Sequence, residues 1–239
     1  MISDIQIYSL GEKALTIELG KTIDAIQYQR VVSLQKLIES MAIEGIIEMV
    51  PSYCSLTIYY EPFVLKNRLL KTPESISQRF KKFLFEIIKN WKPEIEAVST
   101  SEIIEIPVCY EPQYGLDLEE IAAFHQCSID DIIKKHSSAI YTVFIVGFLP
   151  GFPYLGILPD ELATPRKKQP RLKVPSGSVA IGGNQTGIYP IESPGGWNIV
   201  GQTPMKIFDK ERANPFLLKP GNQVKFTPIT EAEFENYKL

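Results

Sequence analysis

The basic segment after Pro165 holds the residues best suited to binding an anion. The chain carries a formal net charge of -3, yet this segment places five cations within eight residues: Arg166, Lys167, Lys168, Arg171 and Lys173. Prolines at positions 165, 170 and 175 favour an extended loop. Such a loop can grip a carboxylate or a phosphate, and arginine does so best because it binds in bidentate geometry. Arg166, next to the turn, is the preferred candidate; a solvated surface loop is the alternative.

Histidine provides the second candidate group. His136 closes a predicted helix over residues 129–135 and precedes a buried-type strand over 140–146. In that place it could act as a general acid or base, or as an orienting donor. The alternative is a cation that interacts with the dipole at the end of the helix. The chain's other histidine, His125, fits the structural alternative better.

A turn-rich stretch surrounds these groups. Ten of the chain's 15 glycines lie between Gly147 and Gly201. Glycine lets a backbone or a ligand approach closely. Aromatic residues flank these glycine turns and are either core or the walls of a pocket: Phe148, Phe152, Tyr154, Tyr189 and Trp197. Ser178, Gln185 and Thr186 add hydrogen-bonding groups, and the Phe152-Pro153 bond is a candidate cis peptide.

Known nucleotide and metal motifs are absent from the sequence. Gly182 and Gly187 have the spacing of a phosphate-binding loop, but Ile188-Tyr189 stands where Lys-Ser/Thr is required. The amides of this turn could still form a nest for an anion. With two histidines and no C-x-x-C or H-E-x-x-H pattern, no metal site is expected.

The elements that must position these groups fall into two parts. Residues 1–95 predict a small α+β domain of order ββαββα. Its strands are expected over 5–10, 14–19, 46–50 and 55–60, with helices over 22–40 and from Thr72-Pro73 to just before Lys92-Pro93. Both helices are expected to cover one face of an antiparallel sheet. A polar linker over 94–102 follows.

Residues 103–239 predict a second domain of many short strands, which indicates a barrel or a sandwich. Asp117 and Ser128 are expected to cap helices over 118–125 and 129–135. Strands are expected over 103–108, 140–146, 178–181, 187–191, 198–200, 205–208 and 223–228, with a final helical turn over 231–237.

Composition limits the class of protein. The chain has 239 residues, is 44% hydrophobic and has a pI of about 5.6, so no overall field favours nucleic acid or an anionic membrane. No apolar run approaches the roughly 20 residues of a spanning helix, and no signal peptide is evident. Three widely spaced cysteines fit reduced thiols and a cytoplasmic protein.

Several long motifs resemble the KipI/PxpB family, which is also labelled allophanate hydrolase subunit 1. The motifs cover nearly the whole chain: Leu10-Gly-Glu-Lys-Ala14, Val50-Pro-Ser-Tyr-x-Ser-Leu56, Gly147-Phe-x-Pro-Gly-Phe-Pro-Tyr-Leu155, Pro165-Arg166, Pro175-x-Gly-Ser-Val179, Gly182-x-x-Gln-Thr-Gly-x-Tyr-Pro190, Ser193-Pro-Gly-Gly-Trp197 and Gly201-x-Thr-Pro204.

The resemblance implies an N-terminal α+β domain and a C-terminal cyclophilin-like β-barrel. It implies the small subunit of a 5-oxoprolinase complex, inactive alone, that uses ATP and water to open 5-oxo-L-proline to L-glutamate, ADP and phosphate. The implied partners are a KipA/PxpC-type subunit and a LamB/YcsF-type (PxpA) subunit. Two alternatives stay open: an inhibitor of a sporulation histidine kinase, and a subunit of another amide hydrolase such as allophanate hydrolase.

The resemblance also implies the site residues. His136 would act as the acid or base and Arg166 as the carboxylate or phosphate clamp. The residues expected to bind substrate are Phe148, Pro150, Gly151, Pro175, Gly177, Gln185, Thr186, Tyr189 and Trp197.

Overall fold

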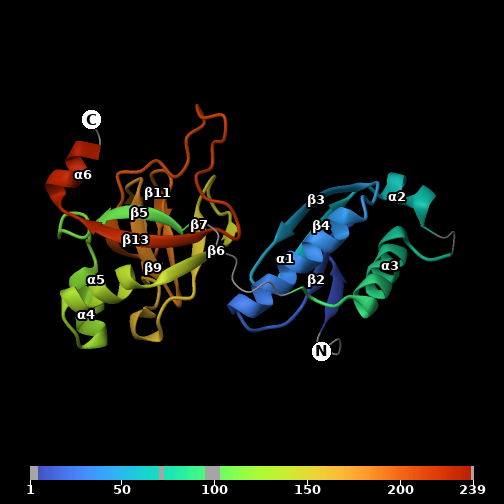
Figure 1. The fold of residues 1–239 in the computed structure, drawn as a ribbon, viewed down its shortest axis with the longest axis horizontal. Coiled ribbons are helices and arrows are strands. Elements are labelled where there is room, and N and C mark those ends of the chain that lie inside the picture. The colour runs from blue at the N-terminus through green and yellow to red at the C-terminus, as the bar shows by residue number, and fades with distance from the viewer. Residues whose placement is uncertain (1–4, 70–72, 95–102, 238–239) are drawn as a thin grey trace. The chain divides into compact units, whose positions relative to one another are not determined.

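The computed structural model describes residues 5–69, 73–94 and 103–237 (Figure 1). The chain forms two compact units, Met1–Ser99 and Thr100–Leu239. The domain limits expected from the sequence are 1–95 and 103–239. The expected limits and the limits of the two units differ only in residues 95–102. Those residues lie outside the described part of the chain, so the exact limits stay a prediction.

The N-terminal unit is a four-stranded antiparallel sheet covered on one face by helices. The strand order is β1-β2-β4-β3, with β1 at Gln6–Ser9, β2 at Ala14–Glu18, β3 at Ile46–Pro51 and β4 at Ser55–Tyr60. Alternate residues of β2 and β4, such as Ile17 and Ile58, form one core with Leu34 of α1 (Ala25–Ser40) and Leu84 of α3 (Ile76–Asn90). This arrangement confirms the predicted α+β class.

Local capping explains where the helices of this unit begin. Asp24 accepts a hydrogen bond from the Gln27 amide at 2.7 Å and starts α1 three residues after the predicted position. Ser75 and Gln78 form a capping box that starts α3 at Ile76 rather than at Thr72-Pro73; Thr72 itself lies outside the described residues. A short helix, α2 (Pro62–Arg68), was not predicted.

The C-terminal unit is a closed barrel (Figure 1). Its strand order is β10-β7-β6-β13-β5-β12-β9. The strands are β5 (Ile103–Cys109), β6 (Ile140–Val146), β7 (Pro153–Gly156), β9 (Ser178–Gly182), β10 (Gln185–Ile188), β12 (Asn198–Gln202) and β13 (Gln223–Ile229). Residues from the strands and from α4 (Leu118–His125) and α5 (Ile129–Ser138) pack into one core. The predicted β-barrel is thereby confirmed.

Several local predictions in the barrel unit are wrong. Residues 205–208 form a loop with an isolated bridge between Phe208 and Phe216, not a strand. The expected basic loop is partly a strand, because β8 (Arg171–Val174) pairs with β11 (Ser193–Gly195). Among the described residues the cis peptide bond lies at Gly156–Ile157 and not at Phe152-Pro153.

A second, smaller core lies on the outer face of the barrel. Val179, Ile181 and Val200 point into the barrel core. Because side chains alternate along a strand, Ala180 and Ile199 point outward. There they pack with Phe152, Tyr189, Trp197 and Val174 of β8. This outer core is the base on which the candidate site is built.

Candidate functional site

An aromatic cluster centred on Phe152 forms the wall of the candidate site. Ring centroids lie 5.6 Å away at Phe148, 4.9 Å at Tyr154, 5.2 Å at Tyr189 and 5.5 Å at Trp197. The structure decides between the two roles considered for these rings. Phe152, Tyr189 and Trp197 are buried core residues, whereas Phe148 is 66% exposed and is available to a ligand or partner.

The glycines of the turn-rich stretch make room for these rings. A Cβ at Gly182 would lie 2.5 Å from two carbons of the Trp197 ring, and one at Gly195 would collide with the Tyr189 hydroxyl. A Cβ at Gly187 would lie 2.8 Å from the Pro153 carbonyl oxygen and 3.0 Å from the Phe152 ring. The glycines therefore let aromatic rings lie flat against the backbone, rather than leaving free amides for an anion.

Arg166 lies on this wall. Its guanidinium carbon is 5.5 Å from the Trp197 ring centroid, which is the geometry of a cation–π contact. The loop is fixed on both sides, because the Lys167 amide donates to the Gly196 carbonyl at 2.8 Å and Asn198 Nδ2 donates to the Pro165 carbonyl at 2.9 Å. Arg166 is thus an exposed cation with a defined position.

Two tyrosine hydroxyls feel the charge of Arg166. Burial raises the pKa of Tyr154, and the Arg166 charge acts against that rise. Burial likewise raises the pKa of Tyr189, opposed by a hydrogen bond with the Trp197 backbone and by Arg166. Both hydroxyls therefore stay protonated near neutral pH. Because Tyr189 is buried in the core, the partly buried Tyr154 is the hydroxyl that can join the Arg166 guanidinium in binding an anion.

A buried carboxylate anchors the basic segment. Asp117, fully buried, accepts hydrogen bonds from Arg171 Nη2 at 2.6 Å, from Arg171 Nη1 at 2.9 Å and from the Ile199 amide at 2.6 Å. Lys167 Nζ lies 2.7 Å from the same carboxylate. Burial would raise the pKa of Asp117, but the hydrogen bonds of Arg171, Lys167 and Ile199 outweigh it and hold the pKa below its usual value.

This arrangement corrects the prediction that Asp117 caps α4 with its side chain, because that side chain makes no cap hydrogen bond. Ser128, in contrast, forms the predicted capping box with Asp131 at the start of α5.

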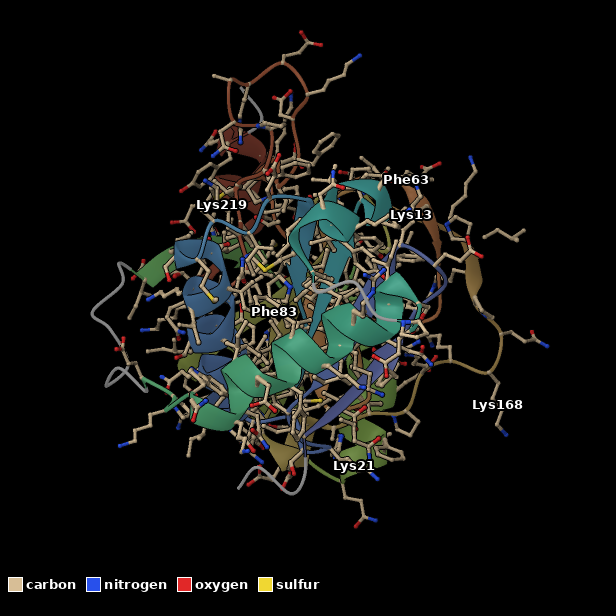
Figure 2. All side chains as sticks on the ribbon, turned by 90° about the vertical axis from the view of Figure 1, so that its right-hand side faces the viewer. Lys13, Lys21, Phe63, Phe83, Lys168 and Lys219 are labelled. Carbon is tan, nitrogen blue, oxygen red and sulfur yellow. The ribbon has the colours of Figure 1, made fainter. Side chains whose placement is uncertain are left out.

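The five cations of the segment therefore differ in availability. Lys167 and Arg171 are engaged with Asp117, and Lys173 lies 3.5 Å from Glu192. Lys168 extends away from the ribbon at the tip of its loop (Figure 2). In the described part of the chain no carboxylate pairs with Arg166, so its hydrogen-bond donors are open to a ligand.

His136 lies inside the barrel unit, away from solvent. Its relative exposure is 0%, its ring stacks on Phe226 at 4.7 Å, and burial lowers its pKa to about 3. The Tyr110 hydroxyl lies 2.8 Å from Nδ1, and Nε2 lies 2.9 Å from Thr186 Oγ1. Thr186 in turn donates to the Ala180 carbonyl at 3.2 Å. One tautomer satisfies every group: Tyr110 donates to Nδ1, and Nε2–H donates to Thr186. This geometry fits a neutral, orienting imidazole better than a group that exchanges protons with substrate.

The other expected site residues divide into three groups: aromatic residues, buried residues of β10, and glycines and prolines at turns. Trp197, Tyr189 and Phe148 lie in the aromatic cluster with Arg166, whereas Thr186 and Gln185 are buried in β10. Gly151 has a φ of +83°, and a Cβ there would lie 2.9 Å from the Phe208 side chain. Gly177 has a φ of +82°, and its amide donates to the Tyr189 carbonyl at 2.7 Å. Pro150 and Pro175 are exposed beside these turns.

The predicted amide nest at Gly182–Gly187 is wrong. Gly182 ends β9, Gln185–Ile188 forms β10, and the two strands pair as a hairpin. The Gly183 amide donates to the Thr164 carbonyl at 2.8 Å, so this backbone donor serves the fold.

Sequence reasoning missed Tyr110 and assigned Asp117 a simpler role. Tyr110 carries no motif that points to His136, 26 positions away. The signal for Asp117 was the cluster of cations with no acidic residue nearby in the sequence. Such a cluster favours a carboxylate from elsewhere in the fold, but it does not indicate which one. No group of three or more potential metal ligands occurs among the residues the structure describes, and no helix there is both long and apolar enough to cross a bilayer.

Comparison with known proteins defines the class. The family model for the carboxyltransferase domain, subdomains C and D, matches residues 5–218, so the chain belongs to this family. Within it, the chain is 38% identical over 234 residues to a 5-oxoprolinase subunit of Bacillus subtilis (strain 168), an alignment that covers 98% of this chain and 96% of that protein. These matches confirm the resemblance to the KipI/PxpB family.

Solved structures show the same fold. The crystal structure of TTHA0988 matches with a TM-score of 0.74 and 32% identity over 91% of this chain, which spans 40% of that longer chain. The crystal structure of the K. lactis urea amidolyase matches with a TM-score of 0.76 over 99% of this chain and 15% of its own. At 23% identity the second match shows the fold alone.

Proposed function

We propose that this protein is the small subunit of an ATP-dependent 5-oxoprolinase complex, which opens the lactam of 5-oxo-L-proline to L-glutamate. The observation that carries the proposal is the end-to-end similarity, at 38% identity, to a protein named as one subunit of 5-oxoprolinase. The proposed partners are a KipA/PxpC-type subunit and a LamB/YcsF-type subunit, and the proposed location is the cytoplasm.

The chemistry of the reaction gives Arg166 a role. A lactam carbonyl is a poor electrophile, and phosphorylating its oxygen creates a leaving group. A fixed cation with a hydroxyl donor beside it stabilises the charge on such an oxygen or phosphate. Arg166, held on Trp197 near Tyr154, supplies this arrangement. The role of His136 in this proposal is to hold Thr186 and β10 in place.

The relatives are named as one subunit of 5-oxoprolinase, which supports a chain that acts only within the complex. We assign the use of ATP to the complex and propose no nucleotide site on this chain.

Glutamate release tests the proposal. The protein, alone and with its two partners, is given 5-oxo-L-proline and ATP. Release in the full mixture alone supports the proposal. Turnover of allophanate in place of 5-oxo-L-proline would instead indicate another amide hydrolase, and an assembled but inactive mixture would redirect attention to histidine-kinase inhibition.

A further inference from the structure

Phe148 has a backbone conformation that bulky residues rarely adopt. Its φ is +70°, and the Leu149 amide donates to the Gly147 carbonyl at 2.9 Å. Phe148 is therefore the central residue of a γ-turn, and the form of this turn with a positive φ is rare and strained.

The surrounding chain holds this turn in place. The Gly147 amide donates to the Phe152 carbonyl at 3.0 Å, and the Phe152 amide donates to the Leu149 carbonyl at 3.0 Å. Strained backbone persists only where the neighbouring structure fixes it, and such residues cluster at functional sites.

The Phe148 ring contributes little to the core of this chain. It is 66% exposed, and it meets the Phe152 ring edge to face with centroids 5.6 Å apart. Glycine or asparagine would adopt the same backbone conformation with less strain. A bulky, exposed ring at a strained position is therefore better explained by contact with another molecule than by folding.

The surface beside Phe148 is also aromatic. Residues 205–217 form an arm that projects from the barrel (Figure 1), and on this arm the Phe208 and Phe216 rings pack with centroids 5.4 Å apart. The arm contacts the turn, because a Cβ at Gly151 would lie 2.9 Å from Phe208 Cβ and 3.5 Å from Phe216 Cδ1. Phe216 is 38% exposed. Phe148, Phe208 and Phe216 together form a phenylalanine patch.

The arm adds an excess of positive charge at the edge of this patch. It carries three cations, Lys206, Lys210 and Arg212, against two acids, Asp209 and Glu211. Asp209 serves the arm itself: its side chain is 18% exposed and accepts from the Glu211 amide at 3.1 Å. The Lys206 and Lys210 side chains are 73% and 82% exposed. A complementary partner surface therefore has carboxylates around an apolar pocket.

We infer that the phenylalanine patch docks a protein partner of this chemistry, with Phe148 as the anchor that enters the apolar pocket. Buried aromatic anchors supply much of the affinity of protein interfaces. The inference rests on the proposed function in one respect, because the partner is taken to be another subunit of the 5-oxoprolinase complex. Phe152 contacts both Phe148 and Trp197, so a partner docked here reaches the edge of the wall that carries Arg166.

Urea unfolding of the full chain tests the strain at Phe148. Phe148→Ala and Phe148→Gly both remove the ring, but only glycine adopts a positive φ freely. Phe148→Gly should therefore unfold at a higher urea concentration than Phe148→Ala. Phe124, a 57% exposed residue of α4, is the matched control. There the usual helical order should hold, with Phe124→Ala more stable than Phe124→Gly.

Titration calorimetry of the full chain with the two proposed partner subunits, singly and mixed, tests the docking. Phe148→Ala should weaken the complex at least about thirtyfold, as for an aromatic hot spot. Lys210→Glu should weaken it by a smaller factor that shrinks at high salt. Phe124→Ala in α4 and Lys134→Glu in α5 are the controls, since these helices lie away from the arm (Figure 1). Both should leave the dissociation constant unchanged.

Three results would overturn the inference. These are an unchanged dissociation constant for Phe148→Ala, a raised KM for 5-oxo-L-proline without weaker partner binding, and Phe148→Gly no more stable than Phe148→Ala. Failure of the proposed function is distinguishable from these results. A complex that depends on Phe148 but releases no glutamate would support the docking surface and contradict the activity, whereas a wild-type chain that binds neither subunit would overturn both.

Discussion

Arg166 is the residue on which the chemical account depends. It is exposed, so its removal affects the fold little. Its position is nevertheless fixed by the Trp197 ring and by two hydrogen bonds that its loop makes, one with the Gly196 carbonyl and one with the Asn198 side chain. We predict that Arg166→Ala lowers the glutamate-release rate of the reconstituted complex at least about a hundredfold, the usual cost of removing one donor from a developing charge. Arg166→Lys should recover only part of the rate, because an ammonium cannot bind in bidentate geometry.

The matched control for this prediction is Lys173→Ala, which removes an exposed cation from the same segment. It should keep the wild-type rate. An Arg166→Ala complex with unchanged turnover would remove Arg166 from the mechanism.

His136 makes a prediction about stability and pH. Burial lowers its pKa to about 3, whereas an unfolded histidine keeps a pKa near 6.5. The unfolded chain therefore binds the proton first, and stability is lost as the pH falls from 6.5 towards 3. Between pH 7 and pH 5 this loss should be on the order of 2 kcal/mol.

Urea unfolding at the two pH values measures this loss. His136→Gln should be less stable at pH 7 than the wild type and should lose less stability on acidification. An unchanged slope in His136→Gln would show that His136 is not the titrating group.

Among the elements, the Asp117 cluster joins β8 and the basic segment to α4 and β12. Asp117→Asn removes a buried charge and leaves Arg171 and Lys167 without their main partner. We predict a loss of about 3–5 kcal/mol in the free energy of unfolding, the usual cost of breaking a buried ion pair.

The control is Glu120→Gln. Its carboxylate also contacts Lys167, but its side chain is 70% exposed. It should cost less than about 1 kcal/mol. Equal losses for the two variants in denaturant unfolding would contradict the anchoring role of Asp117.

The glycine-supported aromatic wall makes a second prediction for the elements. Gly182→Ala places a Cβ against the Trp197 ring and should cost about 1–3 kcal/mol through overpacking. It should also change the contribution of Trp197 to the near-ultraviolet circular dichroism spectrum. Gly147→Ala is the control, because a Cβ there meets nothing within 4 Å. If both variants match the wild-type spectrum, the ring does not depend on Gly182.

At the scale of the whole molecule, the sequence predicted the division into α+β unit and barrel because apolar periodicity is a local signal. It also predicted Arg166, Tyr189 and Trp197, which the structure brings together. It failed where long-range contacts decide. Residues 171–174 form a strand only because β11 is available to pair with them. The Asp117 side chain does not cap α4 because it binds Arg171 and Lys167, which are distant in the sequence. The burial of His136 likewise depends on Tyr110, Phe226 and Thr186, which local patterns do not connect.

The measurement that tests the central claim most directly is an omission experiment. Purified partners, ATP and 5-oxo-L-proline are mixed with and without this chain, and L-glutamate and ADP are quantified together. The account predicts that both products form only when this chain, both partners and ATP are present. Equal glutamate release without this chain, or no release from a mixture shown to assemble, would contradict it.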